Sequence, residues 1–183
     1  MTWNPDAPAP FPTAAVDGGT FRLRLASPAD LPAIVALLAD DAMGAAREAD
    51  EDMVPYEQAF AAIEADPAHL LVVGELVRPG AAALGTGEPG AGEGAVVATF
   101  QLSFLPGISR RGAWRSQIEA VRVAGSLLGL GIGNLMVRWA IDESRRRGCT
   151  LMQLTTHKSR AAAHRFYGRL GFEASHEGMK LTL

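Results

Sequence analysis

The order of apolar and polar positions in the first third of the chain predicts a strand followed by two helices. Apolar and basic residues alternate from Phe21 to Ala26, which is typical of a half-buried strand. Ser27 can then cap a helix that has Pro28 at its first position. One face of this helix is apolar, through Leu31, Ile34, Val35 and Leu38. A second helix is expected from about Pro55 to Ala65.

The remaining apolar segments predict, in chain order, three strands, a helix, a strand, a helix and a final strand or strand pair. Their approximate ranges are 70–77, 95–105, 115–123, 131–147, 149–156, 159–170 and 172–183. The helix at 131–147 has its apolar residues on one face and can end at Gly148. The resulting order, β-α-α-β-β-β-α-β-α-β, indicates an α/β (α+β) fold in which helices cover both faces of a mixed sheet.

The composition indicates one folded domain over residues 20–183. The chain has 183 residues, of which 48% are apolar and 20% are charged, and this is enough for a sizeable core. Residues 1–19 are rich in proline, alanine and glycine, so we expect a flexible N-terminal arm. Residues 78–94 are too rich in glycine to pack well and predict a mobile hairpin loop.

Charge and cysteine content narrow the expected partners and compartment. The net charge of -3 gives no general attraction to nucleic acid, and no apolar run is long enough to span a bilayer. Cys149 is the single cysteine, so it forms no internal disulfide and fits a reducing compartment. The first residues do not read as a signal peptide. We therefore expect a cytoplasmic protein that binds neither nucleic acid nor membrane, and no metal, because the four histidines lack ligand spacing.

The stretch from Ser126 to Met136, SLLGLGIGNLM, contains three glycines and no charge in front of the helix at 131–147. The first turn of a helix leaves its N–H groups unpaired, and the helix dipole adds positive charge there. Glycine lets the backbone approach an anion, so this loop can hold a phosphate without a basic side chain. A P-loop would need lysine where Asn134 follows Gly133, so that kind of ATP site is disfavoured. A tight structural turn is the alternative interpretation.

The glycine loop and the helix at 159–170 carry two motifs. From Leu128 the loop reads Leu-Gly-Leu-Gly-Ile-Gly, and from Arg160 the helix reads Arg-Ala-Ala-Ala-His-Arg-Phe-Tyr, with Gly171 and Phe172 beyond. Together with QIEAVRV before the loop, they resemble the GNAT superfamily of acyl-CoA-dependent N-acetyltransferases over about residues 112–183. That family's loop has the form Arg/Gln-x-x-Gly-x-Gly/Ala, from which only Leu128 departs. Its later motif, Asn-x-x-Ala-x-x-x-Tyr, is matched except that Arg160 replaces asparagine.

The resemblance implies a GNAT-type mixed, mostly antiparallel sheet of about six or seven strands, and acetyl-CoA as the cosubstrate. Without a guanidinium at Leu128, we expect weaker phosphate binding, or compensation by Lys158, Arg160 or Arg165. The strand edge near Val121 to Val123 could pair with the pantetheine amides and supply an oxyanion donor. The expected cofactor-binding residues are Val121, Arg122, Val123, Leu128, Gly129, Leu130, Gly131, Ile132, Gly133, Asn134, Arg160, Ala163 and Phe166.

Acetyl transfer to an amine requires a neutral nitrogen, and Glu119 is our candidate for the base that removes its proton. It lies in the strand before the glycine loop, where GNAT relatives often carry a carboxylate, and a structural ion pair is the alternative role. The resemblance places Tyr167 where its hydroxyl can hydrogen-bond the departing thiolate, although a core position would suit it too. Cys149 is better suited to a core than to nucleophilic attack, so direct transfer is expected.

These features predict an N-acetyltransferase that moves an acetyl group from acetyl-CoA to a primary amine of a small molecule. The alternatives are a non-catalytic acyl-CoA-binding regulatory module, which Leu128 and Arg160 would support, and an acetyltransferase that acts on a protein amine. An acidic stretch hints at a cationic acceptor, although such runs are also typical of solvated surface. Its acidic residues are Asp50, Glu51, Asp52 and Glu57. Whether the protein forms a homodimer stays an open question.

Overall fold

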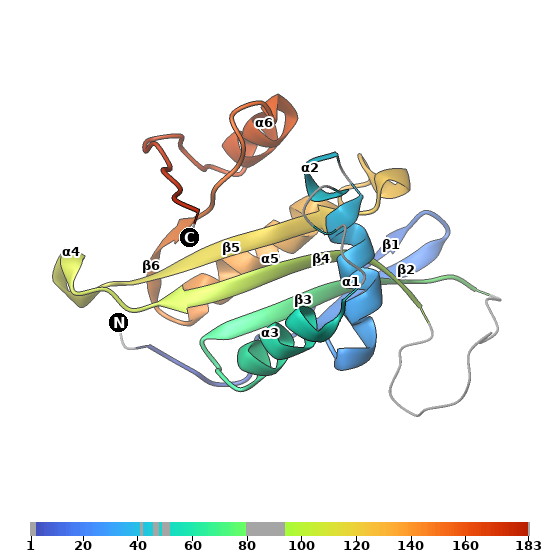
Figure 1. Ribbon diagram of the computed structural model, residues 1–183, viewed down its shortest axis with the longest axis horizontal. Coiled ribbons are helices and arrows are strands. Elements are labelled where there is room, and N and C mark those ends of the chain that lie inside the picture. The colour runs from blue at the N-terminus through green and yellow to red at the C-terminus, as the bar shows by residue number, and fades with distance from the viewer. Residues whose placement is uncertain (1–2, 41, 46–47, 49–51, 80–93, 183) are drawn as a thin grey trace.

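The computed structural model describes residues 3–40, 42–45, 48, 52–79 and 94–182, and its centre is a six-stranded sheet (Figure 1). The strands follow one another across the sheet in chain order. They are β1 (Thr13–Val16), β2 (Gly19–Leu25), β3 (His69–Val77), β4 (Ala95–Leu105), β5 (Trp114–Val123) and β6 (Cys149–Gln153). Neighbours are antiparallel except β5 and β6, which are parallel because a helical crossover connects them. The predicted mixed, mostly antiparallel sheet is confirmed.

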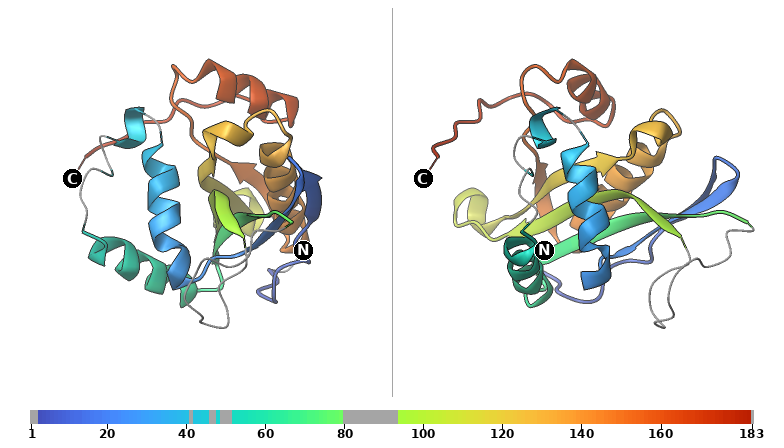
Figure 2. Two further views of the ribbon diagram at one scale, coloured as in Figure 1. Left: turned by 90° about the vertical axis from the view of Figure 1, so that its right-hand side faces the viewer. Right: turned by 45° about the vertical axis from the view of Figure 1, so that its right-hand side comes forward.

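Helices lie on both faces of this sheet (Figure 2). One face carries α1 (Leu31–Ala39) and α3 (Val54–Glu64), and the other carries the crossover helix α5 (Ile132–Arg146). The shorter elements are η1 (Pro28–Asp30), α2 (Ala42–Ala45), α4 (Ser109–Gly112), η2 (Gly125–Leu127) and the two-turn α6 (Ala161–Arg169). The predicted helix bounds agree with α3 and α5 to within a residue or so. Within the described residues, no helix is long and apolar enough to cross a membrane.

The main hydrophobic core fills the space between the sheet and α5. Alternate residues of the central strands point to this side, and six of them are at most 2% exposed. They are Phe21, Leu23, Phe100, Leu102, Phe104 and Ile118, and α5 contributes Ile132, Met136, Val137 and Ala140. The amphipathic pattern of α5 therefore fixes which face of β4 and β5 is apolar, and leaves the polar residues of these strands on the opposite face.

The N-terminal segment lies against the body of the protein. β1 pairs with β2 in a hairpin, so the predicted domain boundary at residue 20 falls inside a folded element. Farther upstream, the Trp3 ring stacks on Trp114 at a centroid distance of 4.2 Å. Phe11 likewise stacks on Trp139 at 4.7 Å. The proline-rich composition concealed these contacts, because two isolated aromatic residues leave no periodic signal. The flexibility of residues 1–19 stays a prediction.

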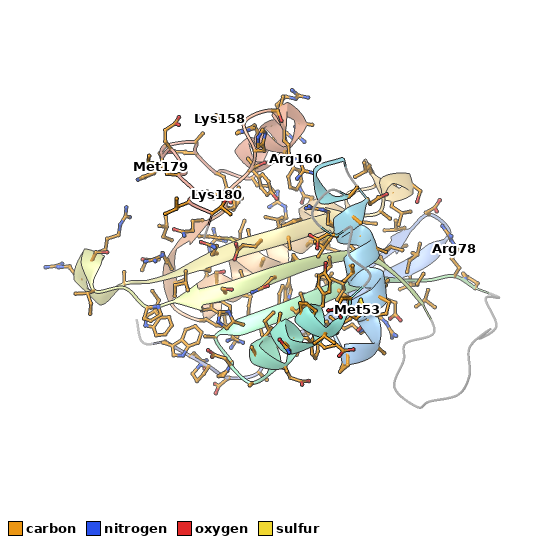
Figure 3. All side chains as sticks on the ribbon, viewed as in Figure 1. Met53, Arg78, Lys158, Arg160, Met179 and Lys180 are labelled. Atoms are coloured by element: carbon orange, nitrogen blue, oxygen red, sulfur yellow. The ribbon has the colours of Figure 1, made fainter. Side chains whose placement is uncertain are left out.

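The predicted final strand at 172–183 is wrong for the residues that the structure describes. The chain from Phe172 to Thr182 has no regular secondary structure, and Met179 and Leu181 are 96% and 84% exposed. Figure 3 marks Met179 and Lys180 on this segment. A strand-like sequence forms a strand only where a neighbouring edge and an apolar face receive it. Most of the predicted glycine-rich hairpin loop, residues 80–93, lies outside the described residues.

A buried ionic network holds the end of α5. The carboxylate of Glu143 accepts hydrogen bonds from Arg146 Nε and Arg147 Nε, both at 2.7 Å, and from the backbone N–H of Ala9. The Glu143 and Arg147 side chains are 0% and 1% exposed. Arg147 also donates to the Pro67 carbonyl at 2.7 Å, and its guanidinium lies over the Phe104 ring. The network thus joins α5 to the N-terminal segment and to the turn before β3.

This network predicts a specific dependence of stability on pH. Burial alone would raise the pKa of Glu143, but the hydrogen bonds from Arg146, Arg147 and Ala9 outweigh it and hold the pKa below its ordinary value of 4.5. A carboxylate with a lowered folded-state pKa adds stability above about pH 4.5, and this is lost as pH falls through the folded-state value. Glu143→Gln should therefore cost about 3–5 kcal/mol of unfolding free energy near pH 7. The deficit should shrink in acid.

Denaturant unfolding of both proteins between pH 7 and pH 3 measures this effect. Asp142→Asn is the matched control, because Asp142 pairs with Arg145 at 3.0 Å while both side chains are 73% exposed. Its effect should stay within about 0.5 kcal/mol at every pH. Curves for wild type and Glu143→Gln that run parallel into acid would contradict the assigned role of Glu143.

Candidate active site

The glycine loop forms an open cradle at the N-terminus of α5. Gly129 and Gly131 have φ values of +85° and +84°, and a side chain added at either would meet no atom within 4 Å. The first backbone hydrogen bond of α5 runs from Leu135 N to Gly131 O at 3.0 Å. The N–H groups of residues 132–134 come before this hydrogen bond in the chain. Such N–H groups have no acceptor within a helix. The free space and the donors together fit the phosphates of an acyl-CoA.

Two exposed side chains of this loop are apolar, Leu128 and Leu130, which are 68% and 46% exposed. The first position of the motif therefore offers no guanidinium to an anion. Of the predicted compensating cations, Lys158 pairs with Glu177 at 2.7 Å on the C-terminal side of the molecule (Figure 3). The sequence analysis did not name Arg138 as a cation near the cradle. Its Nε donates a hydrogen bond to Asn134 Oδ1 at 2.6 Å in the first turns of α5.

β5 separates from β6 halfway along its length. The two strands pair from Trp114 with Cys149 to Gln117 with Gln153, and β5 then continues to Val123 without β6 beside it. On its other side β5 contains a bulge against β4, where Ala120 has a φ of +53°. A bulge bends a strand and increases its twist. The edge at Val121 to Val123, where the sequence placed the pantetheine and the oxyanion donor, is therefore open in the described chain.

Glu119 lies at the start of this opening. Its Cα pairs with that of Gln101 on β4, it immediately precedes the bulge residue Ala120, and its side chain is exposed. In the described chain, Glu119 has no ion pair, so the alternative of a structural ion pair receives no support. An exposed, unpaired carboxylate beside an open strand edge is placed to accept a proton from a bound molecule.

Tyr167 lies on α6, which is placed beyond the β6 side of the sheet (Figure 1). Its ring contacts Phe166 and Phe172 edge-on at centroid distances of 5.0 and 5.6 Å. Burial raises the pKa of Tyr167, and the charges of Arg160 and Arg122 oppose this only partly. The phenol therefore stays protonated at neutral pH, and within the described residues its hydroxyl has no hydrogen-bond partner.

Phe166 connects this helix to the cradle. A side-chain carbon added at Gly133 would lie 3.5 Å from the Phe166 ring, so the start of α5 and α6 are in contact there. Ala163 lies one turn earlier on α6, and Arg160 occupies the position before its first residue. The start of α5 and α6 therefore lie side by side at Phe166.

A row of polar side chains crosses four strands on the face of the sheet opposite α5, which is called the open face below. The sequence analysis did not identify this row. Pairing aligns His69 of β3, Ser103 of β4, Gln117 of β5 and Gln153 of β6. His69 Nδ1 lies 2.9 Å from Ser103 Oγ, and Gln153 Nε2 donates to Gln117 Oε1 at 2.6 Å. The alternation of polar residues along each strand is visible in the sequence. Only the register between the strands shows that these four side chains lie next to one another.

Comparison with known proteins identifies the family. A model of the acetyltransferase (GNAT) family matches residues 47–172. The chain belongs to the GNAT family. The solved structure of a protein from Bacillus halodurans, named a transcriptional regulator, is 38% identical with a TM-score of 0.75, covering 89% of this chain and 99% of that one. A putative acetyltransferase from Agrobacterium tumefaciens is 26% identical with a TM-score of 0.66, covering 88% and 99%.

The similarity to a curated enzyme is shorter. The aminoalkylphosphonate N-acetyltransferase of Salmonella typhimurium is 38% identical over 63 residues, which are 34% of this chain. The chain thus spans 41% of the length of that relative. This match concerns part of a GNAT domain, so it leaves the acceptor of the present protein open.

Two further predictions about this GNAT chain can be examined in the structure. Burial raises the pKa of Cys149 to about 11, so its thiol is protonated at neutral pH and poorly suited to nucleophilic attack. This agrees with the expected direct transfer. In the acidic stretch, Asp52 and Glu57 are described, and Asp52, two residues before α3, accepts a hydrogen bond from Val54 N at 3.0 Å. Asp50 and Glu51 lie outside the described residues.

The cradle geometry predicts the effect of one substitution on acetyl-CoA binding. A ligand that binds only the folded protein raises its melting temperature with concentration. Acetyl-CoA at millimolar concentration should do so for the wild type. Gly131→Val should abolish the shift, because the side chain would fill the open cradle and strain a positive φ. Differential scanning fluorimetry measures both proteins.

Gly18→Val separates cradle filling from backbone strain. Gly18, in the β1–β2 turn, also has a positive φ, +71°, with nothing within 4 Å of an added side chain. This control should lose stability to a similar extent and keep the full acetyl-CoA shift. A wild type with no shift, or a Gly131→Val protein that retains it, would exclude the cradle as the cofactor site.

Proposed function

We propose that this GNAT protein transfers an acetyl group from acetyl-CoA to a primary amine of a small molecule. The observation that carries the proposal is the open β5 edge, which has the phosphate cradle at one end and Glu119 beside it. The name of the Salmonella typhimurium relative, which gives N-acetyl transfer to an aminoalkylphosphonate, also supports an amine acceptor. Cys149 as the single cysteine supports a cytoplasmic location.

The proposed residues remove a proton from the acceptor amine and stabilise the charge that develops on the acetyl group. Acetyl-CoA, when bound, supplies an activated thioester. Glu119 accepts the proton of the acceptor ammonium, directly or through water, so that the neutral nitrogen can bond to the acetyl carbon while the carbon–sulfur bond breaks. This help is substantial, because deprotonating an alkylamine with a pKa near 10 costs about 4 kcal/mol at pH 7. Main-chain N–H groups near Val121 can stabilise the carbonyl oxygen as it gains charge.

Tyr167 is proposed to stabilise the departing sulfur. Its raised pKa keeps the hydroxyl proton in place, and the hydroxyl has no other partner within the described residues. It can therefore donate a hydrogen bond to the thiolate. A thiol, with an ordinary pKa near 8.5, is more acidic than this phenol, so complete proton transfer from Tyr167 is unfavourable. The thiolate then takes its final proton from solvent.

A non-catalytic regulatory module is the second candidate. It is favoured by Leu128, by Arg160 in place of asparagine, and by the name of the Bacillus halodurans structure, a transcriptional regulator. The two candidates differ in one measurement, the acetyl-CoA-dependent release of thiol in the presence of amines. Steady release by wild type supports the transferase, whereas acetyl-CoA binding without release supports the module.

Tyr167→Phe tests the proposed hydrogen bond to the leaving group. We expect turnover to fall about 10- to 100-fold, because a hydrogen bond to a charged group contributes about 1.5–3 kcal/mol. The acetyl-CoA melting shift should be nearly unchanged, since the bond matters mainly in the transition state. Tyr56→Phe removes the other tyrosine hydroxyl, on α3, and should leave turnover unchanged. Equal turnover by Tyr167→Phe and wild type, with chemistry rate-limiting, would assign Tyr167 to packing alone.

Glu119→Gln tests the proposed base through its pH profile. The variant keeps the size of the side chain but holds no proton, so we expect a loss of about 10²–10⁴-fold in rate near neutral pH. The loss should shrink as pH approaches the acceptor's own pKa, because free amine then arrives without help. Stopped assays of thiol release from pH 6 to pH 10 on one acceptor measure this, with folding checked at each pH.

Glu57→Gln is the comparison variant, because Glu57 on α3 is one of the two described carboxylates of the acidic stretch, and the other, Asp52, accepts a hydrogen bond from Val54 N. Its profile should follow that of wild type. A Glu119→Gln rate loss that is constant with pH would indicate a structural role, and a pH-dependent loss in Glu57→Gln would move the base to α3.

A further inference from the structure

The residues of β5 that share a face with Glu119 carry an ordered set of charges. Arg115, Gln117 and Glu119 alternate with Trp114, Ser116 and Ile118, which point toward the α5 side. Residues two apart on a strand are about 6.6 Å apart, so about 13 Å separates the Cα atoms of Arg115 and Glu119. This face therefore presents a cation, a neutral amide and an anion in one line.

Arg115 has no electrostatic partner within the described residues. The structure gives it neither an ion pair nor a hydrogen bond, and it is half-exposed. Its strand neighbours on this face are Leu105 and Leu151, so no carboxylate lies across the sheet from it. The guanidinium points toward the β4–β5 connection, near Gly107. A half-buried guanidinium held among apolar neighbours is well placed to bind an anion.

Between Arg115 and Glu119 the open face is polar but carries no fixed charge. Gln117 and Gln153 are joined to each other, and Gln101 Nε2 donates to Ser103 Oγ at 3.4 Å. The titratable member of the row, His69, is at the β3 end, where it contacts Ser103 and faces Asp66 at 3.8 Å. Amides and hydroxyls both donate and accept hydrogen bonds, so this surface suits amide or hydroxyl groups of a ligand.

We propose that the acceptor is amphoteric: its amine lies at Glu119, its amide or hydroxyl groups lie on Gln117 and Gln153, and its anionic end binds Arg115. This proposal rests on the proposed transferase function and names the acceptor class for the same site. About 13 Å separates the Cα atoms of Arg115 and Glu119, which an extended chain of three to four residues spans at about 3.3–3.6 Å per residue. A tripeptide with a free carboxylate has this chemistry, as does an amino sugar with a terminal phosphate at a shorter span.

Two matched acceptor pairs test the role of Arg115. Triglycine and triglycine amide have the same amine, amides and length and differ only in the carboxylate. Glucosamine 6-phosphate and glucosamine form the sugar pair. We expect wild type to prefer the anionic member of at least one pair by about 10-fold or more in kcat/KM at low salt, the ordinary range of a charge-assisted hydrogen bond. Which pair shows the preference distinguishes a peptide from a sugar phosphate.

Arg115→Ala should reduce that preference to about one, through the KM of the anionic acceptor, with kcat for the neutral acceptor unchanged. Arg145→Ala is the matched control, because it removes one guanidinium from the opposite side of the sheet, where Arg145 is 73% exposed. It should retain the preference. Gln117→Leu should raise KM for both members of the preferred pair, since both use the neutral part of the face.

A wild type without preference in both pairs, or a preference that survives Arg115→Ala, overturns the inference. Turnover of simple alkylamines without turnover of either pair also overturns it, while the proposed transferase function stands. If no amine is acetylated, the transferase proposal fails, and the melting shifts that the four acceptors cause in the CoA-saturated protein decide the inference. Equal shifts or none for the two members of each pair then refute it.

Discussion

The main chain at Ala120 is the constraint on which the whole site depends. Its positive φ of +53° is unfavourable for an L-residue, by about 1–2 kcal/mol, and it persists because β4 pairs with β5 on both sides of the bulge. The bulge lies three residues beyond Gln117, the last residue of β5 that pairs with β6. Beyond Gln117 the edge of β5 has no strand beside it in the described chain, and Glu119 lies at the start of this edge. The bulge therefore shapes the region in which acetyl-CoA and its acceptor are proposed to bind.

α5 connects this open site to the buried ionic network at its other end. Its first turn faces the cradle with unpaired N–H groups, while its last turn is fixed by Glu143, Arg146 and Arg147. Basic residues at a helix C-terminus also complement the helix dipole, whose positive end faces the cradle. A helix fixed at one end and packed on the sheet holds its other end in place, so the cradle needs few contacts of its own. This explains how a loop of exposed glycines can remain preorganised for an anion.

The features that the sequence predicted well are those encoded within a few residues. The glycine loop, α5 and the motif ending at Tyr167 depend on local spacing, so their bounds and their family could be inferred. The bulge at Ala120 has no such signal, since alanine is not typical of a positive φ. The row from His69 to Gln153 needs the register of four strands, which separates its members by up to 84 positions in sequence. The N-terminal contacts and the missing final strand likewise depend on tertiary neighbours.

The departure at Leu128 bears on affinity more than on catalysis. A guanidinium there would bind the same phosphate before and during reaction, so its absence weakens the bound ground state and the transition state alike. Such a loss raises the KM for acetyl-CoA and leaves kcat unchanged. Glu119, Tyr167 and the β5 edge are proposed to act where bonds and charges change, and none of these roles uses the side chain at position 128. The leucine is therefore weak support for a protein that has lost turnover, and is compatible with an acetyltransferase that binds its cosubstrate mainly through the backbone.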